Sequence, residues 1–288
     1  MQLTHESEST TGVDTLQLPT IQLARIVAGD SQEQKKLYDA ATRPGGFILD
    51  FRSSHKDILD TIEQLYALSD RYFERPDEEK SRDARDDQLP SQDRGYKRSD
   101  CDETFEFADD ELFRGDIKLP ITLQGKSDLV RNFNRVCHAA TMGMLSSLSD
   151  SMGLEGAQRF ETYHQTDDSS DTGLKLICEP TLASAADVVE NKHTDSGTFT
   201  LLFYERLGLH VYLPRENRWA YAPVPPAGCA LVTVADSLQR LSGGQFLSPL
   251  HRVTQPRDGA HKRFYLSYFL RPSHATKADW ARRLDGGN

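Results

Sequence analysis

Hydrophobic residues recur at two different spacings along this chain, and the change between them divides it into two parts. In the first part, apolar residues three or four positions apart predict helices over residues 31–42, 56–72 and 129–152. Residues 16–26 alternate between apolar and polar positions like a strand before the chain turns, and residues 45–51 read as a short strand that begins in a Gly-Gly turn. The N-terminal part is therefore expected to be mainly helical.

From residue 174 onward the pattern changes to short apolar runs separated by Gly, Pro, Asn and Asp. These runs predict strands over residues 174–179, 199–204, 209–213, 229–234 and 263–270. Many short antiparallel strands favour a sandwich or a double-sheet jelly roll. We therefore expect an α+β protein with a mostly β core, built as a jelly roll and flanked by helices.

The length of the chain, 288 residues, is enough to bury a substantial core. We expect one structural unit, with a helix-and-strand region over residues 1–120 and the jelly-roll region over residues 121–288. Charged residues crowd the segment 74–116, which favours long solvated surface loops there.

Composition narrows the class of protein and its partners. The chain has 37% hydrophobic and 27% charged residues, which is typical of a soluble globular protein. Its net charge of -10 comes without a basic stripe and argues against a nucleic-acid partner. The polar start does not resemble a signal peptide, and no apolar run approaches the roughly 20 residues needed to cross a bilayer. Four widely spaced cysteines favour free thiols over two disulfides, so we expect a cytoplasmic protein. We also expect a monomer without a membrane partner.

Two histidines and one aspartate carry the strongest chemical signal. His193 and Asp195 are two positions apart, so both side chains point to one face of an extended segment. His251 completes the order His-x-Asp…His and is expected to come from an adjacent strand. Two imidazoles and one carboxylate form the facial triad that binds non-heme iron(II) and leaves positions open for oxygen and a substrate. Because His-x-Asp alone occurs often by chance, the residues around it decide the interpretation.

Arg263, shortly after the last histidine, adds the planar fork that binds a carboxylate. Together with their surroundings, these residues resemble the iron(II)/2-oxoglutarate-dependent dioxygenases, specifically the isopenicillin N synthase-like branch. The matching segments are HTDSGTFTLLF, GLHVYLPRENRWAYAPVPP, ADSLQRLSGGQFLSPLHRV and RFYLSYFLRP. The N-terminal part matches less closely, through LPTIQL, GGFIL, RYFERPDEEK and RGYKRSDCDETFEF.

The resemblance implies a double-stranded β-helix and an oxidoreductase that uses iron(II), 2-oxoglutarate and O2. It places the iron at His193, Asp195 and His251, and the distal carboxylate of 2-oxoglutarate at Arg263. It also implies that 2-oxoglutarate is decarboxylated to succinate while a substrate is oxidised by hydroxylation, desaturation or ring rearrangement.

The sequence departs from the family pattern at two positions. The family usually has Arg-x-Ser after the last histidine, and here Tyr265 stands in the place of the serine, on the same face as Arg263. A phenol donates the same hydrogen bond but needs more room, so we expect Tyr265 to bind the co-substrate. The family also commonly has Asn-x-Tyr-Pro before the metal motif, where Glu179 replaces the tyrosine. An ionised Glu179 would repel an incoming carboxylate, so it points elsewhere, is protonated or pairs with a cation. We expect it to contact the organic substrate or an adjacent basic residue.

The organic substrate is expected to be a small, partly aromatic or terpenoid secondary metabolite. Candidate apolar walls of its pocket are Tyr96, Phe105 and Phe199, with Phe107 and Phe203; alternatively these aromatic residues belong to the core. Two other functions stay open at this point. One is an iron(II)-dependent oxidase that does not use 2-oxoglutarate, which the two departures favour. The other is a non-catalytic jelly-roll binding protein.

Overall fold

The computed structural model describes residues 14–89, 92–164, 169–180, 191–254, 256 and 258–285. Its strands are β1 (Thr20–Gln22), β2 (Gly46–Asp50), β3 (Gly95–Arg98), β4 (Glu103–Ala108), β5 (Gly173–Pro180), β6 (Phe199–Tyr204), β7 (Leu209–Leu213), β8 (Arg218–Tyr221), β9 (Cys229–Val234), β10 (His251–Val253) and β11 (Lys262–Leu270). The large sheet has the order β1-β2-β9-β6-β11-β5-β4-β3, and a small sheet has the order β10-β7-β8. Only β1 and β2 pair in parallel among these strands.

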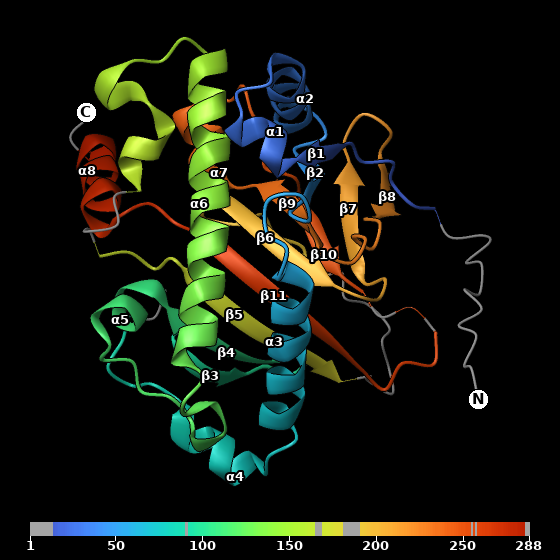
Figure 1. Cartoon of the computed structure of the whole chain (residues 1–288), viewed down its shortest axis with the longest axis vertical. Helices are drawn as coiled ribbons and strands as arrows, with labels where there is room; N and C mark the ends of the chain where they lie inside the picture. The colour runs from blue at the N-terminus through green and yellow to red at the C-terminus, as the bar shows by residue number, and fades with distance from the viewer. Residues whose placement is uncertain are drawn as a thin grey trace.

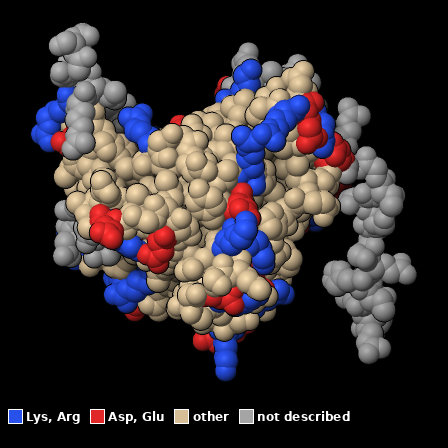
Figure 2. Space-filling view, turned by 90° about the horizontal axis from the view of Figure 1, so that it is seen from above, with Lys and Arg blue, Asp and Glu red and all other residues tan. Residues whose placement is uncertain are grey.

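The helices are α1 (Leu23–Val27), α2 (Ser31–Thr42), α3 (Ile58–Phe73), α4 (Asp77–Lys80), α5 (Asp109–Arg114), α6 (Ser127–Ser151), α7 (Asp236–Leu241) and α8 (His274–Asp285). The two longest, α3 and α6, lie across one face of the large sheet, and the small sheet stands to the right in Figure 1. No helix among the described residues is long and apolar enough to span a membrane. In the face that Figure 2 shows, basic and acidic side chains are interspersed on a mostly uncharged surface.

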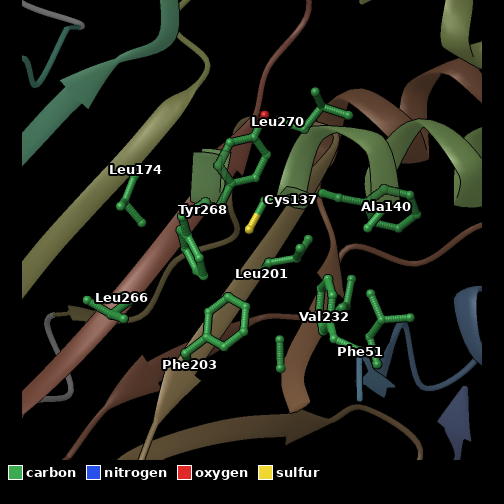
Figure 3. Packing of buried hydrophobic residues seen from close by; sticks show 14 of the residues in the cluster. Phe51, Cys137, Ala140, Leu174, Leu201, Phe203, Val232, Leu266, Tyr268 and Leu270 are labelled. Atoms are coloured by element: carbon green, nitrogen blue, oxygen red, sulfur yellow. The ribbon is translucent and has the colours of Figure 1, made fainter. Parts of the chain in front are cut away.

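The large sheet packs against a different layer on each side, and each face carries a cluster of buried apolar residues. Toward the helices, inward residues of the central strands meet residues of α6, as Figure 3 shows for Leu201, Phe203, Leu266, Tyr268, Cys137 and Ala140. The ring of Phe203, for example, lies 5.3 Å from the ring of Phe133 on α6. Toward the small sheet, a second cluster contains Ile48, Tyr204, Leu209, Val211, Ala222, Cys229, Leu231 and Tyr265. This second face is the one that carries the site.

Most of the predicted elements are confirmed, and so is the mostly β core flanked by helices. Helix α2 occupies the residues predicted for it, and it begins where Asp30 accepts hydrogen bonds from the amides of Gln32 and Glu33 at 3.0 and 2.9 Å. The strands predicted over residues 199–204, 209–213 and 229–234 are β6, β7 and β9. The four cysteines are free in the structure, as expected.

The prediction of surface loops over residues 74–116 is wrong. This segment contains α4, β3, β4 and α5, and β3 and β4 form one edge of the large sheet. Its charges misled the prediction because several of them are buried as ion pairs, which offset the cost of desolvation. Glu106, which is 3% exposed, pairs with Arg271 at 2.7 Å and with Lys175 at 3.1 Å. Arg94 pairs with Glu111 at 2.8 Å.

Candidate metal centre and active site

The backbone brings the predicted metal ligands together between the two sheets. His193 and Asp195 lie in the extended segment that leads into β6, and His251 is the first residue of β10. The amide of each histidine donates to the carbonyl oxygen of the other, at 2.9 Å in both directions. Asp195 Oδ1 lies 3.8 Å from Nε2 of His193 and 3.7 Å from Nε2 of His251. The three side chains thus offer one ligand atom each within 4.8 Å of one another, as the spacing predicts.

Hydrogen bonds leave the metal-facing atoms of these side chains available. His193 Nδ1 lies 2.8 Å from the carbonyl oxygen of Asn191, and His251 Nδ1 lies 3.1 Å from that of Pro249. A carbonyl accepts only, so Nδ1 carries the proton in both rings and Nε2 presents its lone pair. Burial lowers the pKa of His251, which favours the neutral ring that binds a metal.

The aspartate is oriented in the same way. Thr200 donates a hydrogen bond to Asp195 Oδ2 at 2.6 Å, and the Thr233 hydroxyl lies 3.5 Å from the same oxygen. Because Oδ2 is engaged, Oδ1 points toward the two imidazoles. The residues present therefore fit a divalent iron: two neutral imidazoles and one carboxylate on one side, with the other side open.

A cavity of about 200 Å³ extends from the triad between the two sheets. Its apolar walls include Leu202 and Leu231 of the large sheet and Leu209 and Val253 on the opposite side. Its polar lining includes Glu179, Lys175, Thr104, Asp102, Asn191, Tyr265 and Ser267. His193 is half exposed at this cavity, whereas His251 is buried. The metal site is thus reached by solvent from the side of His193.

The two predicted co-substrate residues both lie on β11, but only one of them reaches the cavity. Tyr265 is 3% exposed and lines the cavity, whereas Arg263, which is 2% exposed, is not part of the lining. The guanidinium donates to Asp258 at 2.7 Å and to the carbonyl oxygens of Pro256 and Leu207 at 3.0 and 3.2 Å. The larger phenol fits because residue 208 is glycine: a Cβ there would collide with the Tyr265 hydroxyl.

Polar atoms without partners show that the cavity suits an oxygen-rich ligand. Within the described part of the chain, Glu179 Oε2, Tyr265 Oη and Ser267 Oγ are buried and lack a hydrogen-bond partner of acceptable geometry. Buried polar atoms are normally satisfied, so a ligand with several acceptors is expected among them. A dicarboxylic 2-oxo acid fits this arrangement.

The aromatic residues proposed as pocket walls lie elsewhere. Tyr96, Phe105 and Phe199 are 4%, 2% and 0% exposed and belong to the cluster that faces the helices. On β4, Thr104 lines the cavity, so Phe105 points away from it by the alternation of a strand. The same holds for Phe107 and Phe203, which are buried in the helix-facing cluster. We therefore treat these residues as core.

Sequence reasoning missed residues that support the site. Thr200 and Thr233 orient Asp195, and Lys175 forms part of the cavity wall, where it pairs with Asp93 at 2.7 Å. Each of these residues interrupts an otherwise apolar buried strand, at a position that faces the site. A polar residue within an otherwise apolar strand is the sequence signal that could have identified these three residues.

Comparisons with known proteins agree with this geometry. Residues 157–272 match the model of the 2OG-Fe(II) oxygenase superfamily. The chain is 33% identical over 274 residues to "2-oxoglutarate-dependent dioxygenase frbH" of Dothideomycetidae sp., covering 90% of this chain and 83% of the relative. It is 32% identical over 274 residues to "2-oxoglutarate-dependent dioxygenase gloE" of Glarea lozoyensis, covering 90% of this chain and 80% of the relative.

A solved structure shares the fold. A full-length Neurospora crassa protein, crystallised in complex with alpha-KG and 5-formyluracil, matches with a TM-score of 0.74 at 24% identity, covering 93% of this chain and 87% of that chain. The relatives do not favour the two alternative functions, an oxidase without 2-oxoglutarate and a non-catalytic binding protein. Identity over most of both chains shows that this protein belongs to the 2-oxoglutarate-dependent dioxygenases of the 2OG-Fe(II) oxygenase superfamily.

Proposed function

We propose that His193, Asp195 and His251 hold the iron(II) of this dioxygenase, and that Tyr265 binds the distal end of 2-oxoglutarate with Arg263 supplying positive charge beside it. The observation that carries the metal assignment is the state of the histidines. Both Nδ1 atoms are bonded to backbone carbonyls, so both Nε2 atoms face Asp195 Oδ1 with free lone pairs. Bound iron(II) and 2-oxoglutarate supply the activation of oxygen; the chain supplies orientation, a dry cavity and charge complementarity.

The cavity supports a small organic substrate. Leucines line both sides of the space beside the triad, and His193 is half exposed at its opening. A substrate with a mostly apolar body would pack against Leu202, Leu209 and Leu231, and its polar groups would meet Asn191 or Lys175. We propose a secondary metabolite of this character. We also propose a cytoplasmic monomer, with the free cysteines supporting a reducing compartment.

An anaerobic titration tests the metal and co-substrate assignment without knowledge of the substrate. Iron(II) followed by 2-oxoglutarate is expected to give the weak visible charge-transfer band of the chelate. His251→Ala is expected to lose iron binding and the band while keeping the far-UV circular dichroism of the fold. His210→Ala, a histidine of β7 outside the triad, is the matched control and should keep both. A band that persists in His251→Ala, or no band in the wild-type protein, would contradict the proposal.

A further inference from the structure

Glu179 carries a carboxyl group in the cavity proposed to bind the dicarboxylate 2-oxoglutarate, and two ionised carboxylates would repel each other. Glu179 is 7% exposed, lines the cavity and lies directly opposite Arg263 in the pairing of β5 with β11. Across the described residues, no ion pair joins these two side chains, because the Arg263 fork donates to Asp258 and to two backbone carbonyls instead. The carboxyl group of Glu179 is therefore buried beside a cation that is already engaged.

The surroundings of Glu179 favour its neutral form. Burial is the main cause that raises its pKa to about 8, and the nearby Asp102 carboxylate, also at the cavity, raises it further. The Tyr265 phenol and the Arg263 charge oppose the rise without cancelling it. A neutral carboxylic acid has what an ionised one lacks, an O–H that donates a hydrogen bond.

We propose that the carboxylic acid of Glu179 and the phenol of Tyr265 together donate hydrogen bonds to the distal carboxylate of 2-oxoglutarate, so that co-substrate binding requires a proton on Glu179. The Glu179 carboxyl and the Tyr265 phenol interact with each other, both residues line the same cavity, and among the described residues neither Oε2 nor Oη has another partner. Arg263, which is opposite Glu179 in the strand pairing, contributes positive charge. This inference rests on the proposed function, because it assigns the groups that hold its co-substrate.

The proposal accounts for both departures from the family pattern at once. The resemblance leads us to expect a tyrosine at position 179 and a serine at position 265, both neutral side chains with a hydroxyl group, and this chain has an acid and a tyrosine there. The number of donors is then unchanged, provided that the acid is protonated. Glu179 would make the binding of 2-oxoglutarate depend on pH, whereas the tyrosine and serine hydroxyl groups of the family pattern would not.

Comparing two ligands that differ only in the distal carboxylate separates the contribution of that carboxylate to affinity from effects at the metal. The affinities of the anaerobic iron(II)-loaded protein for 2-oxoglutarate and for 2-oxobutyrate, which lacks the distal carboxylate, are measured by calorimetry and by the chelate band between about pH 6 and pH 9. The ratio of the two affinities is expected to fall as Glu179 ionises and to approach a tenfold loss per pH unit well above its pKa. Effects on the triad or on iron act on both ligands and cancel in the ratio.

Three variants complete the test. Glu179→Gln keeps a neutral donor and should make the ratio independent of pH. Asp102→Asn removes the neighbouring carboxylate, which lowers the pKa of Glu179, so the ratio should begin to fall at a lower pH than in the wild-type protein. Tyr265→Phe should reduce the ratio by roughly tenfold or more at low pH, the loss expected for one hydrogen bond to a charged group.

The outcomes separate this inference from the function on which it rests. A ratio in the wild-type protein that does not change with pH, or that changes equally in Glu179→Gln, would overturn the inference. The absence of a chelate band with both 2-oxo acids at every pH would instead overturn the proposed function.

Discussion

The hydrogen bond from Thr200 to Asp195 offers a direct test of how the metal site is built. Thr200 is 5% exposed on β6, and its hydroxyl lies 2.6 Å from Asp195 Oδ2. Thr200→Val removes the hydroxyl while keeping a β-branched side chain of similar size, so the strand should be retained. A hydrogen bond to a charged group contributes about 1.5–3 kcal/mol, and tenfold in affinity corresponds to about 1.4 kcal/mol. We therefore expect iron(II) affinity to fall by roughly 10–100-fold, the range seen when such supporting groups are removed.

The assay is anaerobic competition for iron(II) between the protein and a coloured chelator, with thermal unfolding of each metal-free variant measured in parallel. Thr233→Val is the matched control, because Thr233 pairs with Thr200 across β6 and β9 but its hydroxyl lies 3.5 Å from the same oxygen. The control should lose much less affinity. Unchanged affinity in Thr200→Val, or a larger loss in Thr233→Val, would refute the role assigned to Thr200.

Three further changes have expected outcomes. Arg263→Lys should weaken 2-oxoglutarate binding in the chelate titration, because a lysine cannot replace a fork that bonds to Asp258 and two carbonyls; equal affinity would show that the arginine is dispensable. Burial raises the pKa of Asp109 to about 7, so its protonated form stabilises the fold at low pH and this stabilisation is lost between about pH 4 and pH 7. Asp109→Asn should flatten that part of the pH profile of urea unfolding, and an unchanged profile would contradict the assignment. Asp30→Ala should lower the free energy of unfolding by about 0.5–2 kcal/mol, because the amides of α2 lose their cap; no loss in urea unfolding would count against this.

The grouping of His193, Asp195 and His251 could be predicted because most of its signal is local. His193 and Asp195 share a face by the period of an extended chain, and that relation needs no knowledge of the rest of the fold. The apolar runs that became β6 and β9 are equally local, since burial on both faces of the large sheet favours strands rich in apolar residues.

The features that could not be predicted depend on residues that are far apart in the sequence. Glu106 is a strand residue because Lys175 and Arg271 neutralise it, and neither partner is visible from residues 74–116 alone. Phe105 and Thr104 alternate along one strand, but only the tertiary structure shows which face meets the helices and which meets the cavity. The engagement of Arg263 by Asp258 is likewise set by the folding of a loop.

The reciprocal backbone pair between His193 and His251 has a consequence for stability. His193 belongs to the segment that enters the large sheet, and His251 begins a three-residue strand of the small sheet. A metal bound to both side chains would therefore link the two sheets. A bound ion stabilises the folded state in proportion to the logarithm of its concentration over its dissociation constant. Loading with iron should therefore slow hydrogen exchange at the amides of β10 most of all. A bound metal would add to the apolar contacts that already join the two sheets, so its loss would loosen the edge at β10 first.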